Sequence, residues 1–196
     1  TISSDGLKAS LLNTVCIFSP NQRLIDFFFS NNKLKIKIVG LDGARTVQPL
    51  LPGCDYVEFK VEGGTNIMLG LATDDCPLTG YCGQYSNGYE NLLALSLIMN
   101  YETKYLSMTQ HSWQFYTNGQ VYHNGGCPAN GASYAVGDTM GVHMDYSIGK
   151  ITWYKNGTQT ATISGVPTST VRPLYPVASF SAMGNSVSVK PRATKP

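Results

Sequence analysis

The chain has few charged residues and lacks a long apolar run. Asp, Glu, Lys and Arg make up 13% of its 196 residues, against about 25% in typical soluble proteins. The longest apolar run, Leu92–Met99, is interrupted by Ser96 and is shorter than the roughly 20 residues that cross a bilayer. The net charge is +2, with no block of like charges. Few Lys and Arg side chains are therefore grouped to neutralise phosphates and release the counterions that drive nucleic-acid binding. We therefore expect neither membrane insertion nor a nucleic-acid partner.

Motifs for metals, cofactors and catalysis are also missing. The cysteines form no C-x-x-C pair and the three histidines have no ligand spacing, so no metal site is expected. Neither a phosphate-binding glycine loop nor a nucleophile elbow is present. We therefore expect a non-enzymatic protein with no cofactor. Cys76 and Cys82 flank a short loop and are candidates for a local disulfide, with reduced thiols as the alternative.

Turn signals and short β-rich runs are abundant instead. Asn-Gly tolerates the positive φ angles of a type I′ turn, the usual two-residue link in a β-hairpin. Many short strands with turns between them predict an all-β fold, and only Leu11–Val15 and Leu92–Met99 are helix candidates. The Asn-Gly pairs begin at Asn87, Asn118, Asn124, Asn130 and Asn156. The expected strands are Tyr56–Val61, Ile67–Ala72, Trp113–Tyr116, Met140–Met144, Ile151–Tyr154, Pro176–Ser181 and Ser186–Lys190.

Several of these runs, in their order along the chain, resemble the SPRY domain family, and in particular the SPRY domains of SOCS-box adaptors. The resemblance extends from about Phe27 to Lys190. It implies a two-sheet antiparallel β-sandwich formed by one domain over residues 1–190, with 1–26 as an N-terminal extension packing on it and 191–196 as a polar tail. The segments that carry it are Tyr56–Val61, Ile67–Thr73, Asp74–Leu78, Ser112-Trp113, Val121–Gly125, Gly137–Gly157 and Leu174–Ser179.

The resemblance also implies recognition of a protein or peptide through loops at one end of the sandwich. Arg45 would donate hydrogen bonds to carbonyls or a carboxylate of the partner, and Thr73 would offer a hydroxyl to a peptide amide. Tyr81 or Trp113 would supply aromatic contact area. Loop packing is the structural alternative for each residue. The adaptors carry a tryptophan-glycine pair where this chain has Met183-Gly184, which we expect to give an adaptable apolar wall.

Two other functions remain open at this stage. The low charge and a first residue that is Thr rather than Met suit a processed piece of a virion or surface-assembly protein, which would form oligomers. A carbohydrate-binding module is the third hypothesis, since lectins include β-sandwiches and Tyr, Trp and Asn suit sugar surfaces. The location, cytoplasmic or on an extracellular or virion surface, is left open. His123 is expected to make a structural hydrogen bond, and His143 to be an exposed imidazole.

Overall fold

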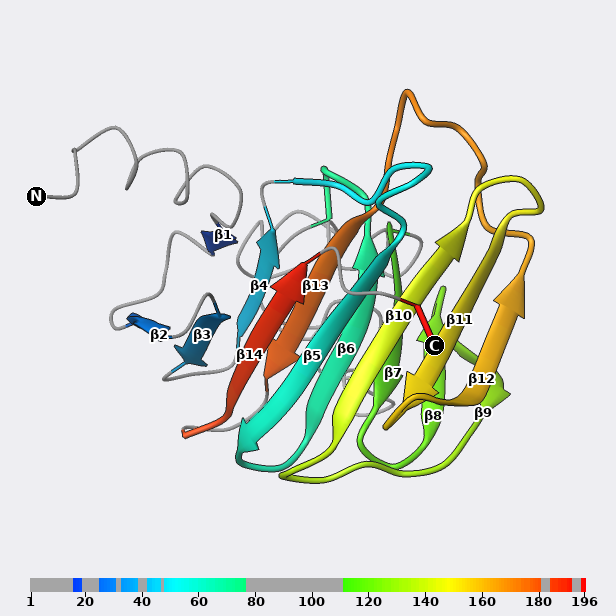
Figure 1. The fold of residues 1–196 in the computed structure, drawn as a ribbon. Helices are drawn as coiled ribbons and strands as arrows, with labels where there is room; N and C mark the ends of the chain where they lie inside the picture. The colour runs from blue at the N-terminus through cyan, green and yellow to red at the C-terminus, as the bar shows by residue number, and fades with distance from the viewer. Residues whose placement is uncertain are drawn as a thin grey trace, which may run out of the picture.

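Two antiparallel β-sheets of seven strands each stack face to face in the computed structural model (Figure 1). The structure describes residues 16–18, 25–30, 33–38, 42–46, 48–76, 111–180, 184–191 and 195–196. Sheet A has the order β1 (Cys16–Phe18), β4 (Asp42–Thr46), β13 (Tyr175–Phe180), β6 (Ile67–Ala72), β7 (Ser112–Tyr116), β8 (Gln120–His123) and β9 (Gly126–Asn130). Sheet B has the order β12 (Thr158–Ser164), β11 (Lys150–Lys155), β10 (Thr139–Asp145), β5 (Tyr56–Gly63), β14 (Ser186–Pro191), β3 (Lys33–Ile38) and β2 (Ile25–Ser30).

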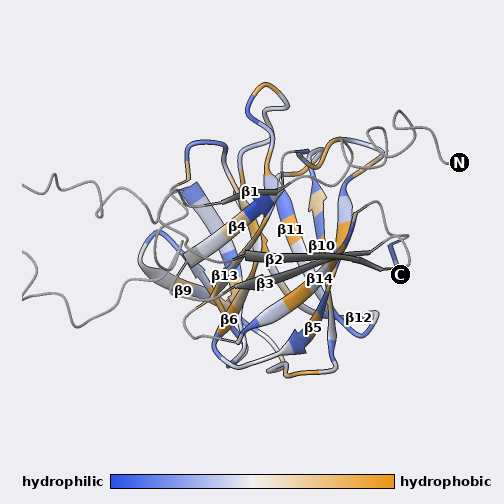
Figure 2. Ribbon diagram, turned by 90° about the vertical axis from the view of Figure 1, so that its left-hand side faces the viewer, coloured by the Kyte–Doolittle hydropathy of each residue, from blue (hydrophilic) through white to orange (hydrophobic). Residues whose placement is uncertain are grey.

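The predicted β-sandwich is confirmed, and the strands match the expected runs where the structure describes them. Apolar and polar residues alternate along strands such as β14 (Figure 2), because successive side chains of a strand point to opposite faces. The two helix candidates lie outside the described residues. Within the described part of the chain, no helix is long and apolar enough to cross a membrane.

The core lies between the sheets and is organised around Trp153 of β11. Its side chain is fully buried and its ring lies 6.1 Å from that of Phe115 in the opposite sheet. The indole Nε1 donates a 3.2 Å hydrogen bond to the Leu69 carbonyl of β6. This bond satisfies the one polar atom of the ring in an apolar environment and joins sheet B to sheet A.

Two of the five Asn-Gly pairs form the predicted hairpin turns. Asn124 and Asn156 have φ angles of 48° and 50°, and the glycines that follow have 69° and 82°, as a type I′ turn requires. The pair at Asn118 differs, since only its glycine has a positive φ, within a three-residue link between β7 and β8. The pair at Asn130 ends strand β9 and is not a hairpin turn. Asn87 lies outside the described residues.

The sandwich includes more of the N-terminal region than the sequence indicated. Cys16–Phe18 forms β1, which pairs with β4 at the edge of sheet A, within the stretch that was expected to pack on the domain as an extension. Ile25–Ser30 forms β2 and pairs with β3 at the edge of sheet B. Near the other end of the chain, β14 extends to Pro191.

Candidate functional site

The strand order places five links that the structure describes at least in part at one end of the sandwich, which we call the upper end (Figure 1). These links follow β4, β6, β8, β10 and β12, and their described residues are 48–55, 73–76 with 111, 124–125, 146–149 and 165–174. The turns that follow β5, β7, β9, β11 and β13 form the lower end. Recognition residues concentrate on loops that a rigid scaffold holds, so the placement of each candidate residue at one end or the other decides which of them can act together.

Arg45 and Thr73 meet at the upper end although 28 positions separate them. Arg45 is paired with Val177 across β4 and β13, while Ala72, the last residue of β6, is paired with Tyr175 on the other side of β13. The Arg45 Nη1 atom therefore reaches the Thr73 carbonyl and donates a 2.5 Å hydrogen bond. Its guanidinium lies 4.9 Å from the centre of the Tyr175 ring, within cation–π range.

The Arg45 side chain is only 8% exposed, and this burial lowers its pKa. Its Nε atom has no hydrogen-bond partner among the described residues. The contact with Thr73 therefore leaves the guanidinium incompletely hydrogen-bonded. A buried donor without a partner costs free energy. The cation thus joins strand β4 to the loop after β6.

Thr73, Asp75 and His111 form a second cluster beside this contact. The Thr73 hydroxyl donates a 2.6 Å hydrogen bond to Asp75 Oδ1, which lies 3.0 Å from His111 Nδ1. The Thr73 hydroxyl, and less strongly His111, lower the pKa of Asp75. Both partners of the imidazole lie at Nδ1, whereas a catalytic relay uses the two ring nitrogens separately. Among the described residues, the cluster therefore fixes the loop and shows no relay through both ring nitrogens.

Trp113 lies at the upper end as well, but its ring is 4% exposed. It stacks on the His123 ring with 4.5 Å between the centroids and 12° between the planes. The His123 Nδ1 atom lies 2.9 Å from the Ser112 carbonyl, which is the structural hydrogen bond expected of this histidine. Trp113 is thus a packed side chain that supports β7 and β8 and offers little open surface.

Gly184 lies at the lower end, away from Arg45 and Thr73. Strand β13 begins where Tyr175 faces Ala72 and ends where Phe180 faces Ile67, and a strand of six residues is about 17 Å long. The backbone of Thr65, in the lower turn between β5 and β6, donates a 3.1 Å hydrogen bond to Asn185 Oδ1. The predicted residues therefore do not form one surface. Tyr81 and Met183 lie outside the described residues.

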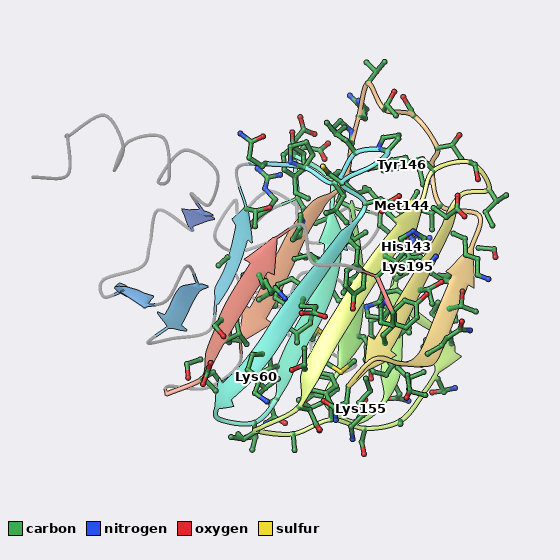
Figure 3. The ribbon with its side chains drawn as sticks, viewed as in Figure 1. Lys60, His143, Met144, Tyr146, Lys155 and Lys195 are labelled. Atoms are coloured by element: carbon green, nitrogen blue, oxygen red, sulfur yellow. The ribbon has the colours of Figure 1, made fainter. Side chains whose placement is uncertain are left out.

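His143 is buried, which corrects the expectation of an exposed imidazole. It is 7% exposed, and burial is the main cause that lowers its pKa, with Lys195 as a second cause (Figure 3). Its Nε2 atom lies 3.7 Å from Asp55 Oδ2. Alternation along β10 places His143 on the face opposite the core residues Val142 and Met144, but β10 is a central strand of sheet B and the imidazole is buried there.

The cysteines and the acidic residues provide no metal centre in the described part of the chain, where no three His, Cys, Asp or Glu side chains converge. Cys76 is disulfide-bonded, while Cys54 and Cys127 are free thiols. Cys82 lies outside the described residues, so its pairing with Cys76 stays a prediction.

The sequence did not indicate Tyr146, which connects two loops of the upper end. Its hydroxyl donates a 2.9 Å hydrogen bond to the Leu50 carbonyl and accepts one of 2.9 Å from the Leu174 amide. The Leu50 amide also donates to the Leu174 carbonyl at 2.8 Å. Burial is the main cause that raises the pKa of Tyr146. In the sequence, Tyr146 is recognisable only as a tyrosine directly after a predicted strand. This position does not reveal that its hydroxyl bonds to Leu50 and Leu174.

Comparison with known proteins supports the architecture and assigns a family. The SPRY domain of human HERC1 superposes with a TM-score of 0.60 at 16% identity, covering 91% of this chain and 99% of that one. Another human SPRY domain gives a TM-score of 0.58 at 15% identity, with 86% and 96% covered. The PSpry domain of TRIM65 gives 0.58 at 16% identity, with 94% and 97% covered.

At these identities the structural likeness shows the fold alone, and no curated protein sequence matches the chain. The family follows from the sequence model of the SPRY domain, which matches residues 56–192 and so covers more than half of the chain. The chain therefore belongs to the SPRY domain family.

Proposed function

We propose that this chain is a non-enzymatic recognition module that binds a protein or peptide partner through the loops of the upper end. Its membership of the SPRY family supports a protein-interaction module. The observation that carries the proposal is the Arg45–Thr73 contact, because it fixes the loop after β6 to strand β4, which comes from a distant part of the sequence. A site held in advance in this way loses little conformational entropy when it binds.

The chemistry beside this contact suits a peptide backbone. Arg45 is buried, so its part is to hold the Thr73 carbonyl and to place a positive charge behind the loop that the partner contacts. Thr73 is partly exposed, and its hydroxyl oxygen can accept a hydrogen bond from a peptide amide. Tyr81 is proposed as the aromatic contact, while Trp113 stabilises β7 and β8. Gly184 is not included, and neither is its sequence neighbour Met183, because Gly184 lies at the other end of β13.

The test is a random-peptide display selection on the purified domain and on its Thr73→Arg variant. Thr158→Arg is the matched control, because Thr158 is exposed at the start of the edge strand β12 near the lower end. The three proteins should have melting temperatures within about 2 °C of one another, a shift that corresponds to under 1 kcal/mol at this size. We expect one motif to be enriched by the native protein and the control and lost with Thr73→Arg.

Two results would contradict the proposal. A motif that Thr73→Arg still enriches would place recognition elsewhere on the molecule. Absence of any enriched motif with the native protein would remove the case for a peptide reader.

A further inference from the structure

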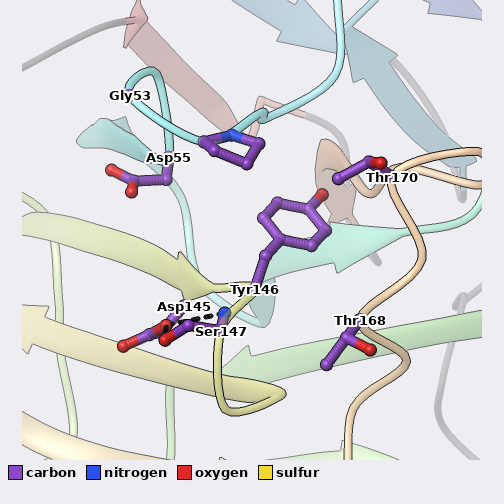
Figure 4. A pocket seen from close by; sticks show the side chains of 8 residues that line it. Gly53, Asp55, Asp145, Tyr146, Ser147, Thr168 and Thr170 are labelled. Atoms are coloured by element: carbon purple, nitrogen blue, oxygen red, sulfur yellow. Dashed lines mark hydrogen bonds between the residues drawn. The ribbon is translucent and has the colours of Figure 1, made fainter.

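A pocket of about 390 Å³ opens at the upper end, on the side of sheet B. It is separate from the Arg45–Thr73 contact, since its walls come from the links β4–β5, β10–β11 and β12–β13. Figure 4 shows the Tyr146 ring between Asp55 and Asp145 on one side and two threonines on the other. The lining residues are Pro52, Gly53, Asp55, Asp145, Tyr146, Ser147, Thr168 and Thr170.

The pocket is held in shape by Tyr146. The hydroxyl of this residue hydrogen-bonds to the backbone at Leu50 and at Leu174, so the links β4–β5 and β12–β13 are fixed to the end of β10. The Tyr146 side chain is 8% exposed, and its two hydrogen bonds are buried. The walls of the pocket are therefore in place before any ligand arrives.

Two carboxylates face this pocket without a strong cationic partner. Neither Asp55 nor Asp145 forms an ion pair with Lys or Arg within the described part of the chain. Asp55 lies 3.7 Å from His143, whose lowered pKa keeps the imidazole neutral at pH 7. Asp145 Oδ1 accepts hydrogen bonds from the Ser147 amide at 2.9 Å and from its hydroxyl at 2.5 Å.

Three exposed apolar residues are sequence neighbours of residues that line the pocket. Leu51, Ile148 and Val171 are 41%, 62% and 90% exposed, and each is the sequence neighbour of a lining residue. The structure describes one other large hydrophobic side chain as exposed, Val136 at 54%, in the link between β9 and β10 at the lower end. Exposed apolar groups beside a polar concavity are typical of a surface that a partner covers.

We propose that this pocket binds an arginine side chain of a protein partner, with apolar neighbours of that arginine packing on Leu51, Ile148 and Val171. A guanidinium offers five donors in a planar fork and no acceptor. The pocket offers the matching acceptors, namely two carboxylates and the hydroxyls of Ser147, Thr168 and Thr170. The charge is complementary, and arginine is less strongly hydrated than lysine, so a partly enclosed site favours it.

The probe is the peptide acetyl-Ala-Leu-Arg-Val-Ala-amide, titrated into the ¹⁵N-labelled domain while amide shifts are recorded. We expect shifts at Tyr146, Ser147, Thr168 and Thr170. Replacing the arginine of the peptide by citrulline, which keeps the shape and removes the charge, should weaken binding at least tenfold. Asp55→Asn and Asp145→Asn should each weaken binding of the arginine peptide about fivefold. Asn at position 145 keeps a side-chain oxygen that can accept the hydrogen bonds from Ser147. Raising the salt from 0.05 to 0.5 M should also weaken binding, because the pocket is open to ions.

The controls separate this site from the one proposed above. Thr73→Arg should leave arginine binding unchanged, so failure of one site does not imply failure of the other. Equal binding of the citrulline peptide, unchanged affinity in both Asp→Asn variants, or no shift at the four amides would overturn the proposal. A lysine peptide that binds as tightly would overturn the choice of arginine.

Discussion

Replacing Tyr146 by Phe removes one oxygen atom and with it two buried hydrogen bonds. The Leu174 amide and the Leu50 carbonyl lose a partner at 2.9 Å each, while the ring keeps its packing. A buried polar group without a partner costs about 1–3 kcal/mol. The Leu50 amide still donates to the Leu174 carbonyl, so the two loops stay connected. We expect each of the two groups to cost about 1–2 kcal/mol, the lower half of the range for one group. The free energy of unfolding should therefore fall by about 2–4 kcal/mol.

Urea denaturation followed by tryptophan fluorescence measures this loss, because Trp113 and Trp153 are both buried in the folded state. Tyr154→Phe is the matched control. Tyr154 is 9% exposed and its hydroxyl makes no hydrogen bond to any described residue, so the same atomic change should cost less than about 0.5 kcal/mol. A loss below about 0.5 kcal/mol for Tyr146→Phe, or equal losses for both variants, would refute the assignment of Tyr146 as the connection between the loops.

Three further predictions concern stability. The pKa of His143 is lowered in the folded state, so the unfolded chain binds the proton first and stability should fall as the pH drops below about 6.5. His143→Gln should reduce this dependence in urea denaturation at pH 7.5 and 5.5. Gly141→Ala should cost about 1–3 kcal/mol by overpacking, since the new Cβ would collide with the Tyr56 hydroxyl oxygen. Asn156→Ala should cost about 2–4 kcal/mol in the same assay, because it loses two side-chain hydrogen bonds and places alanine at a φ of 50° in the left-handed region.

Each of these three has a result that would contradict it. An identical pH profile for His143→Gln would assign the acid sensitivity to other groups. Gly126→Ala is the control for Gly141→Ala, because its new Cβ would meet only the His123 carbonyl at 3.6 Å. Equal stability of the two alanine variants would contradict the overpacking argument. A hairpin that tolerates Asn156→Ala without loss would show that the turn does not depend on this side chain.

Local signals in the sequence predicted local structure well. Asn124-Gly125 and Asn156-Gly157 form their turns because the φ preference acts within two residues. The prediction of a hairpin turn at Asn130-Gly131 was wrong, because this glycine contacts a strand that is distant in the sequence. A Cβ at Gly131 would lie 2.6 Å from the Thr160 carbonyl oxygen of β12, so the glycine permits a close approach between the edges of the two sheets.

The candidate site was harder to predict, because motif order does not reveal which end of the sandwich a residue occupies. Arg45 and Thr73 meet, and Gly184 does not join them, since β13 crosses the length of the sheet in between. Alternation assigned His143 to a face but could not reveal what covers that face. The pocket residues Asp55 and Asp145 lie 90 positions apart in the chain, and only the register of β10 with β5 brings their ends together.

The side chain of Asn156 also bears on how the protein can be modified. Asn156-Gly157-Thr158 fits the acceptor sequence for an N-linked sugar. In the folded hairpin, Asn156 Nδ2 donates to Asp138 at 2.7 Å and Oδ1 accepts from the Thr139 amide at 2.8 Å. The atom that would carry the sugar is thus engaged once the hairpin has formed. In a host that glycosylates its secreted proteins, the fraction of chains with a glycan at Asn156 would report whether modification or folding of this hairpin comes first.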